Sequence, residues 1–285
     1  MKTRLIINLL LVLLVTALGL IAWLKPGQEE AQTARLTTLD LTAINSISIE
    51  REQAETIQLS RDKNQWLITK PITALALAGK IERLIKISQI TPPVRYPLES
   101  TSLKEFGLKP PLVRIQFNEQ ALSIGGTESV HSRRYVSDDT QLYLLDDTFL
   151  HHLTAPLSAF IDTRLLPDGA QITSLQTPTI KLQKNKDNSW QNSLKPAEIL
   201  SADAVQMLFD EWRFARAISV STQWGNAPGE EINLTLSNDQ TLTFTLLRQA
   251  NDVLLISSDK KLAYTLSVDK YQKMTTLTPI DDSNA

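Results

Sequence analysis

Hydrophobic residues are concentrated near the N-terminus of the chain. The segment from Leu5 to Leu24 is almost continuously apolar and is interrupted only by Asn8, Thr16 and Gly19. At about 1.5 Å per residue, a helix of this length spans the roughly 30 Å hydrocarbon core of a bilayer. Insertion is favoured because 14 of its residues are Leu, Ile or Val, each worth about −0.3 to −0.6 kcal/mol near the bilayer centre. The pattern predicts an uncleaved transmembrane anchor within residues 1–25.

The charges beside this segment predict its orientation. Lys2 and Arg4 precede it, whereas Lys25 follows it and is soon succeeded by Glu29 and Glu30. Because basic residues collect on the cytoplasmic side, we expect a cytoplasmic N-terminus and an extracytoplasmic body. A cleaved signal peptide is the alternative, but the apolar run is longer than the usual core of about 7 to 15 residues.

A polar linker is predicted at residues 26–40, and beyond it the pattern repeats at an offset of about 120 residues. Each copy begins with apolar alternation, a polar turn and a tryptophan, which is Trp66 in the first copy and Trp190 in the second. Such a pattern predicts a β-hairpin. Lys70-Pro71 then recurs as Lys195-Pro196.

One amphipathic helical pattern follows in each copy. In the second copy, Ser201 is the expected N-cap. An apolar stripe at helical spacing predicts that each helix covers a sheet. The stripe consists of Leu77, Ile81, Leu84 and Ile85 in the first copy, and of Val205, Leu208, Phe209 and Trp212 in the second.

Alternating strand patterns complete each copy. Val113, Ile115 and Phe117 correspond to Ile232, Leu234 and Leu236, and Tyr143 corresponds to Tyr264. Strict alternation with short polar turns favours antiparallel sheets. We therefore predict an α+β fold with two tandem repeats at 41–163 and 164–278, each an antiparallel sheet with one covering helix, and a flexible tail at 279–285.

Composition and charge narrow the function classes. The 285 residues contain no cysteine, which excludes disulfides, cysteine zinc sites and thiol nucleophiles. The formal net charge is −2. The first 25 residues hold three basic and no acidic residues, so the remainder carries 26 basic against 31 acidic residues. An acidic body argues against nucleic acid as a partner.

No catalytic motif is recognisable. The three histidines are His131, His151 and His152, and none lies in a metalloprotease or hydrolase motif. Asp138-Asp139 and Asp146-Asp147 are typical of turns at hairpin ends, with carboxylate chemistry as the alternative. We predict no enzymatic activity, no cofactor and no metal; a hydrolase with dispersed carboxylates is the weakest of three functional hypotheses.

One cluster is a candidate contact site. Gly125-Gly126 is predicted as a hairpin turn before a strand that carries Arg133 and Arg134. A guanidinium group can bind a carboxylate or phosphate through two hydrogen bonds. Gly125, Gly126, Arg133 and Arg134 are therefore candidates for contact with an anionic ligand or a partner, and a solvated strand edge is the alternative.

Five motifs in order resemble a bacterial family labelled domain of unknown function 4340. They are Trp66–Pro71, Leu103–Pro111, Leu122–Gly126, Arg134–Val136 and Leu142–Leu144. The resemblance implies a membrane-anchored bacterial protein, in some cases a companion of ABC-type export systems similar to the gliding-motility type. It supplies no catalytic residues. The second copy lacks counterparts of the glycine pair and of Pro110-Pro111.

These features predict a noncatalytic accessory or scaffold protein of the bacterial inner membrane. It would be single-pass through residues Leu5 to Leu24, with a periplasmic body and an ABC-type permease or another envelope protein as partner. The alternative is a periplasmic binding module for envelope glycan or another anionic ligand.

Overall fold

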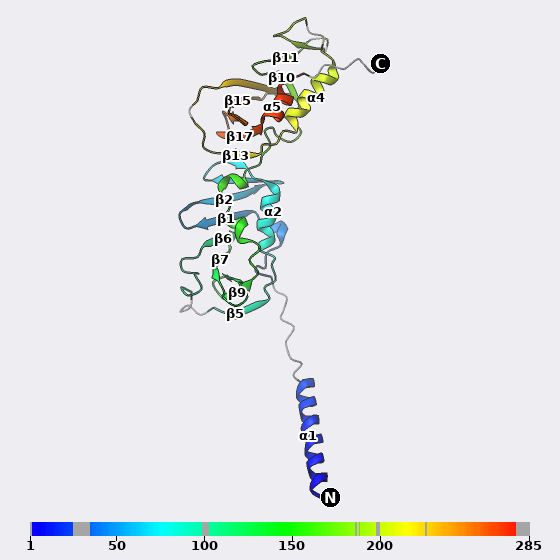
Figure 1. The fold of residues 1–285 in the computed structure, drawn as a ribbon, viewed down its shortest axis with the longest axis vertical. Helices are drawn as coiled ribbons and strands as arrows, with labels where there is room; N and C mark the ends of the chain where they lie inside the picture. Colours follow the sequence, from blue (N-terminus) through cyan, green and yellow to red (C-terminus); the bar gives the residue numbers. More distant parts are fainter. Residues whose placement is uncertain are drawn as a thin grey trace.

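The computed structural model describes residues 2–24, 35–98, 103–185, 187, 189–197, 200–225 and 227–277. Helix α1 covers Lys2–Leu24 and is drawn apart from the two sheets in Figure 1. The side chains described in α1 lie between Arg4 and Leu20, with gaps. Over the described residues, no helix combines the length and the apolar character needed to cross a membrane. Residues 26–34 of the predicted linker and the predicted tail at 279–285 lie outside the described residues.

The first repeat is built on a nine-stranded antiparallel sheet in the order β4-β3-β2-β1-β6-β7-β8-β9-β5. Helix α2 (Ala78–Ile87) connects β4 to β5, and a single helical turn, α3 (Leu150–Leu153), follows the last strand. The strands are β1 (Ser46–Arg51), β2 (Ala54–Asp62), β3 (Gln65–Lys70), β4 (Ala74–Leu75), β5 (Val94–Pro97), β6 (Val113–Phe117), β7 (Gln120–Thr127), β8 (Arg134–Ser137) and β9 (Gln141–Leu145).

The second repeat is built on an eight-stranded antiparallel sheet in the order β12-β11-β10-β14-β15-β16-β17-β13. Helix α4 (Ala202–Arg213) connects β12 to β13, and α5 (Val268–Thr275) follows the last strand. The strands are β10 (Ile172–Gln176), β11 (Lys181–Lys184), β12 (Trp190–Asn192), β13 (Ser219–Ser221), β14 (Glu230–Leu236), β15 (Thr241–Arg248), β16 (Asp252–Ser257) and β17 (Leu262–Ser267).

The two sheets have the same strand order once β4 is set aside. Matching β10 to β1, β14 to β6 and β13 to β5 turns one order into the other. In the first repeat, helix α2 follows β4 and precedes the edge strand β5, which pairs with the last strand, β9. In the second repeat, helix α4 follows β12 and precedes the edge strand β13, which pairs with the last strand, β17. The predicted α+β class and the two-repeat organisation are thus confirmed, and α5 is an addition that the sequence pattern did not predict.

The residue pairs that suggested duplication occupy equivalent strands. Trp66 and Trp190 are both partly buried against the core, each on the strand that closes the first hairpin of its repeat. Tyr143 and Tyr264 are both buried on the last strand of the meander. Tyr143 lies between Val136 and Arg95, and Tyr264 lies between Leu255 and Val220.

A short stretch of main chain, residues 160–164, joins the two sheets and is called the junction segment here. On one side the N–H of Asp162 donates to Leu75 O at 2.8 Å, and Ala76 forms an isolated antiparallel bridge with Ile161. On the other side the N–H of Ala217 donates to Thr163 O at 2.8 Å. The junction segment therefore pairs with residues at the edge of the first sheet and with those that lead into edge strand β13 of the second, and most buried apolar residues of both repeats belong to one cluster.

The helical faces agree largely with the sequence pattern. Ser201 caps α4 by accepting a hydrogen bond from Ala204 N at 3.0 Å, and Trp212 is completely buried. In α2 the buried residues include Ile81 and Leu84 as predicted. They also include Lys80, whose ammonium group lies 4.9 Å from the centre of the Phe160 ring. Burial lowers the pKa of Lys80.

Candidate functional site

The predicted glycine turn is wrong. Gly125 and Gly126 lie inside strand β7, and the loop containing Phe106 and Gly107 packs directly on them. The N–H of Gly126 donates to Phe106 O at 2.7 Å, and a Cβ at Gly125 would lie 2.3 Å from that oxygen. Gly107 has φ +65°, a conformation that glycine adopts at little cost. Glycine is needed at these positions because the backbone of the loop at Phe106 packs directly on the backbone of β7. This contact joins two segments that are not adjacent in the sequence.

The two candidate arginines already bind carboxylates. Arg134 begins β8; its Nε donates to Asp147 Oδ2 at 3.1 Å and its Nη1 donates to Gly125 O at 3.1 Å. Arg133 Nε donates to Asp146 Oδ1 at 3.3 Å. The structure thus brings Arg134 and Gly125 together, while Arg133 faces a separate carboxylate. Contact between this cluster and an anionic ligand stays a prediction, and any such ligand would compete with Asp146 and Asp147.

Beside this cluster, polar residues line up across four strands of the first sheet. Glu50 on β1 is opposite Arg114 on β6, Arg114 is opposite Ser123 on β7, and Ser123 is opposite Ser137 on β8. Arg114 Nη1 donates to Ser123 Oγ at 3.3 Å, and Nη2 lies 3.5 Å from Asp139 Oδ2. We call Glu50, Arg114, Ser123 and Ser137 the polar row.

The polar row forms the floor of a pocket of about 480 Å³. Its walls come partly from the segment that resembles the family motif, through Leu103, Leu108, Pro110 and Pro111. A volume of this size lies in the usual range for small-molecule sites, about 300 to 1,000 Å³. The sequence pattern missed this site because strand register, rather than sequence proximity, brings its residues together.

The second repeat has an equivalent row without charges. Gln176 is opposite Asn233, and Asn233 is opposite Thr243, whose hydroxyl donates to Asn233 Oδ1 at 2.8 Å. By the shared strand order, these residues match Glu50, Arg114 and Ser123 respectively. Charged residues at the three matched positions therefore occur only in the first repeat, although Lys181 is opposite Gln176 and Glu231 accepts a hydrogen bond from Asn233 Nδ2 at 2.6 Å in the second.

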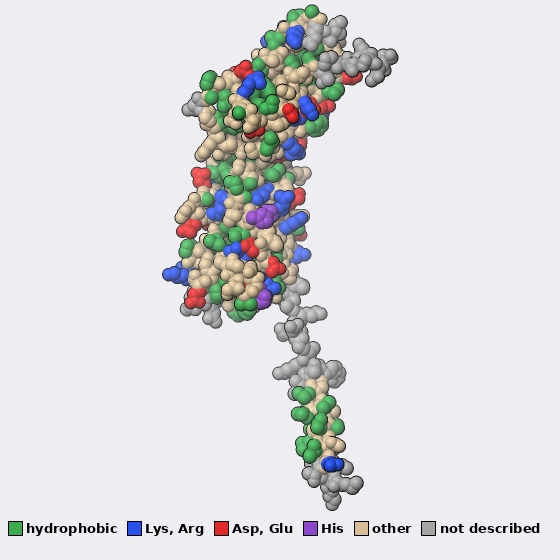
Figure 2. Space-filling model, in the orientation of Figure 1, with side chains coloured by type: hydrophobic (Ala, Val, Ile, Leu, Met, Phe, Trp, Pro, Cys, Tyr) green, Lys and Arg blue, Asp and Glu red, His purple; other side chains and the backbone are tan. Residues whose placement is uncertain are grey.

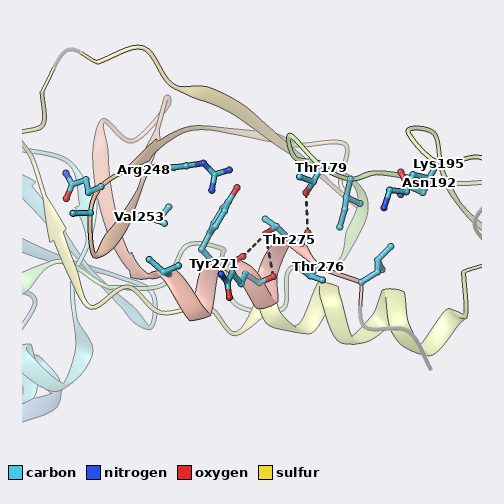
Figure 3. A pocket seen from close by; sticks show the side chains of 14 residues that line it. Thr179, Asn192, Lys195, Arg248, Val253, Tyr271, Thr275 and Thr276 are labelled. Atoms are coloured by element: carbon cyan, nitrogen blue, oxygen red, sulfur yellow. Dashed lines mark hydrogen bonds between the residues drawn. The ribbon is translucent and has the colours of Figure 1, made fainter. Parts of the chain in front are cut away.

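The larger pocket lies in the second repeat, between α5 and the ends of the sheet (Figure 3). Its volume is about 520 Å³. Tyr271 from α5 and Arg248 from β15 meet at one end, and Lys195 and Asn192 lie at the other. Burial raises the pKa of Tyr271.

Asp138 is held in place by hydrogen bonds at the turn between β8 and β9. Asp138 accepts hydrogen bonds from Thr140 N at 3.0 Å, Gln141 N at 2.8 Å and the Tyr143 hydroxyl at 2.6 Å. Burial raises the pKa of Asp138, but these hydrogen bonds outweigh it, so the pKa lies below its ordinary value. The turn interpretation of Asp138 is confirmed. His151 and His152 lie in α3. Figure 2 shows that acidic and basic side chains are interspersed over the visible face of the molecule.

No group of three or more His, Asp or Glu side chains suited to a metal ion occurs among the described residues. The buried carboxylate at the junction is Asp162, which binds Arg164 with an Nη2 to Oδ2 distance of 2.6 Å and lies 3.8 Å from Arg216 Nη1. The hydrogen bonds that Arg164 donates to Asp162 and Asp168 raise its pKa. These groups are paired with each other across the junction.

The fold defines a class of duplicated α+β protein in which two antiparallel sheets of equal strand order are joined edge to edge. A family model described as a domain of unknown function, DUF4340, matches residues 86–235, and the chain belongs to this family. The match begins in α2 and ends in β14, so it includes the junction segment and parts of both repeats. No curated protein and no solved structure matches the chain.

Proposed function

We propose that this protein is a noncatalytic, membrane-anchored accessory or scaffold protein whose two repeats lie outside the cytoplasm. The apolar sequence from Leu5 to Leu24 supports the anchor, since it is long enough to span a bilayer as a helix. The polar Thr16 is compatible with lipid because its hydroxyl donates to Val12 O at 2.8 Å within the same helix. Lys2 and Arg4 support a cytoplasmic N-terminus.

The observation that carries the scaffold proposal is the edge-to-edge joining of the repeats by the junction segment. Main-chain hydrogen bonds on both sides of residues 160–164, together with a continuous buried core, oppose hinge motion between the sheets. A stiff, elongated body holds its ends at a fixed separation, which is what a protein that positions other membrane components requires.

Two exposed apolar residues near the junction support the proposal of a partner-binding surface. Phe214 and Ile218 are 68% and 69% exposed, although both are large apolar residues. They flank Arg216 and Ala217, which pair with the junction segment. Exposed apolar residues that lie close together are typical of contact sites between proteins. We call these two residues the junction patch.

Crosslinking of the full chain in native membranes, followed by purification in mild detergent and mass spectrometry, tests this proposal. We expect a membrane protein as the crosslinked partner, and the family resemblance suggests an ABC-type permease. Phe214→Ser with Ile218→Ser should reduce the yield, whereas Val130→Ser should leave it unchanged because Val130 is exposed in the first repeat. A protein that crosslinks to nothing in its own membrane would contradict the scaffold role.

A second candidate function is a binding module for envelope glycan or another anionic ligand. The observation that favours it is the ionic polar row below the pocket of the first repeat. Replacing Glu50→Gln, Arg114→Asn and Ser123→Thr installs the residues of the second repeat at equivalent positions, so the fold should tolerate the change. Co-sedimentation with isolated cell-wall sacculi should then be lost. Unchanged co-sedimentation would exclude the polar row as the site.

A further inference from the structure

The pocket of the second repeat is enclosed by three separate parts of the chain. Helix α5 forms one wall, the ends of β11 and β12 form another, and the turn between β15 and β16 forms the third (Figure 3). Thr179 Oγ1 donates to Thr275 O at 3.3 Å and so ties the second wall to the first. The pocket is therefore built by tertiary packing and is not a gap beside a loose loop.

Part of the inner surface of this pocket is apolar. Val253 and Ile180 are 3% and 4% exposed, and Tyr271 is 4% exposed. Val268 and Leu277 extend the apolar surface along α5. Such a lining favours a hydrocarbon group, because each buried CH₂ contributes about 0.8 kcal/mol.

The rim of the pocket is basic. Arg248 lies with its guanidinium carbon 5.3 Å from the centre of the Tyr271 ring, and its Nη2 donates to Glu230 Oε2 at 3.2 Å. Lys195 is exposed at the opposite end (Figure 3). Among the described residues that line the pocket there are two cationic side chains and no carboxylate. An anionic group is therefore favoured over a cationic or neutral one.

From these contacts we propose that the pocket between α5 and the second sheet binds a single-chain amphiphilic anion. The anionic group lies beside Lys195 at one end of the pocket, and the hydrocarbon chain extends along Ile180, Tyr271 and Val253 toward the other end. The volume of about 520 Å³ accommodates a small ligand of this kind. This site is separate from the junction patch and from the polar row, so it does not depend on either function proposed above.

The first repeat provides an internal control. Lys70-Pro71 matches Lys195-Pro196, but the helix that follows the last strand is only the four residues of α3, compared with eight in α5. A basic residue is therefore present at both positions, whereas the helical wall of the pocket exists only in the second repeat. Lys70→Ala is the matched control for Lys195→Ala.

The test uses the full chain in nanodiscs of neutral phosphatidylcholine and a decanoate analogue that carries a photoreactive diazirine. After irradiation, mass spectrometry should locate the label on α5 or on residues 248–253. Octanoate should compete at roughly 15-fold lower concentration than hexanoate, since each buried CH₂ changes affinity about fourfold. Decanol and acetate should compete poorly because each lacks one of the two required groups.

Variants separate a binding role from a structural one. Lys195→Ala should weaken competition by decanoate about tenfold, as expected for loss of one charge-assisted contact, and Lys70→Ala should have no effect. Glu230→Gln should change the competition much less than Lys195→Ala does, because Glu230 binds Arg248 at the opposite end of the pocket. Equal competition by decanol, no dependence on chain length, or equal effects of the two lysine variants would each overturn the proposal. Labelling confined to α1, or binding only to anionic phospholipid vesicles, would do so as well.

Discussion

The main-chain N–H of Asp162 donates to Leu75 O at 2.8 Å, and its side chain binds Arg164 two residues later. The same residue thus contributes to both sides of the junction: its backbone pairs with the first sheet, and its carboxylate also lies 3.8 Å from Arg216 of the second repeat. Asp162 is 6% exposed, so these contacts replace those that water would otherwise make.

Replacing Asp162 by Asn should therefore destabilise the protein. The amide cannot balance the charge of Arg164, and loss of one partner from a largely buried pair costs about 2 kcal/mol when the other partner keeps some contact with water. Urea unfolding followed by tryptophan fluorescence measures the change. Asp168→Asn is the control, because Asp168 binds the same arginine but is 69% exposed; its effect should be below about 0.5 kcal/mol. Equal effects would contradict the role assigned to Asp162.

Gly125→Ala should displace the loop that packs on β7. The added Cβ would lie 2.3 Å from Phe106 O, which is a backbone atom that cannot rotate away. We expect a loss of at least about 2 kcal/mol in the free energy of unfolding. Gly79→Ala in the first turn of α2 meets no atom within 4 Å, so it should be neutral or stabilising by up to about 1 kcal/mol. Thermal denaturation of both variants distinguishes close backbone contact from a general sensitivity of glycines.

The two candidate arginines should differ in their effect on stability. Arg134 is 11% exposed and binds both Asp147 and Gly125 O, whereas Arg133 is 27% exposed and binds Asp146, which is itself 78% exposed. Arg134→Met should cost about 2 kcal/mol because it leaves a carbonyl and a carboxylate without their partner. Arg133→Met should cost less than about 0.5 kcal/mol. A reversed order in chemical denaturation would show that the ion pairs were misassigned.

Stability should fall in alkaline solution. Burial, together with the charges of Asp162 and Asp259, raises the pKa of Tyr264 to about 12, compared with 10.0 for a free phenol. Between about pH 10 and pH 12, Tyr264 keeps its phenolic proton in the folded state and loses it in the unfolded state. The contribution of Tyr264 to stability is therefore complete below pH 10 and is lost as the pH rises toward 12. Burial and the hydrogen bond to Asp138 shift the pKa of Tyr143 in the same direction.

Urea unfolding between pH 8 and pH 12 measures this dependence. Tyr264→Phe should reduce the alkaline loss by roughly 2 to 3 kcal/mol, because two pKa units correspond to about 2.7 kcal/mol. Tyr143→Phe should likewise reduce the loss of stability at alkaline pH. If wild type and Tyr264→Phe lost stability in parallel, ionisation of Tyr264 could not be the cause.

The sequence predicted the central strands well because apolar alternation is a local pattern that does not depend on which strand is the pairing partner. Val113, Ile115 and Phe117 are completely buried, as strict alternation requires. The helix face of α4 and its cap at Ser201 were predicted for the same reason, since both depend on residues within one or two turns.

Features that depend on distant contacts were missed. Gly125 and Gly126 were taken for a turn because glycine pairs often mark turns, but here Phe106 from a separate loop requires them. The burial of Lys80 against the Phe160 ring also depends on a residue distant in the sequence, so the local pattern of α2 does not indicate it. The pocket of the second repeat depends on α5, a helix of eight residues that the sequence analysis did not predict, although its cap Ser267 accepts from Lys270 N at 3.1 Å.

The junction segment also protects the protein from self-association. An open sheet edge presents unpaired N–H and C=O groups to which another chain can add as a further strand. Two antiparallel sheets have four such edges, and residues 160–164 pair with β4 of one and with the residues that lead into β13 of the other. The edges left open are β5, with four residues, and β12, with three. By joining its own repeats, the chain covers one edge of each sheet, and only the short strands β5 and β12 remain as edges to which a neighbouring molecule could add.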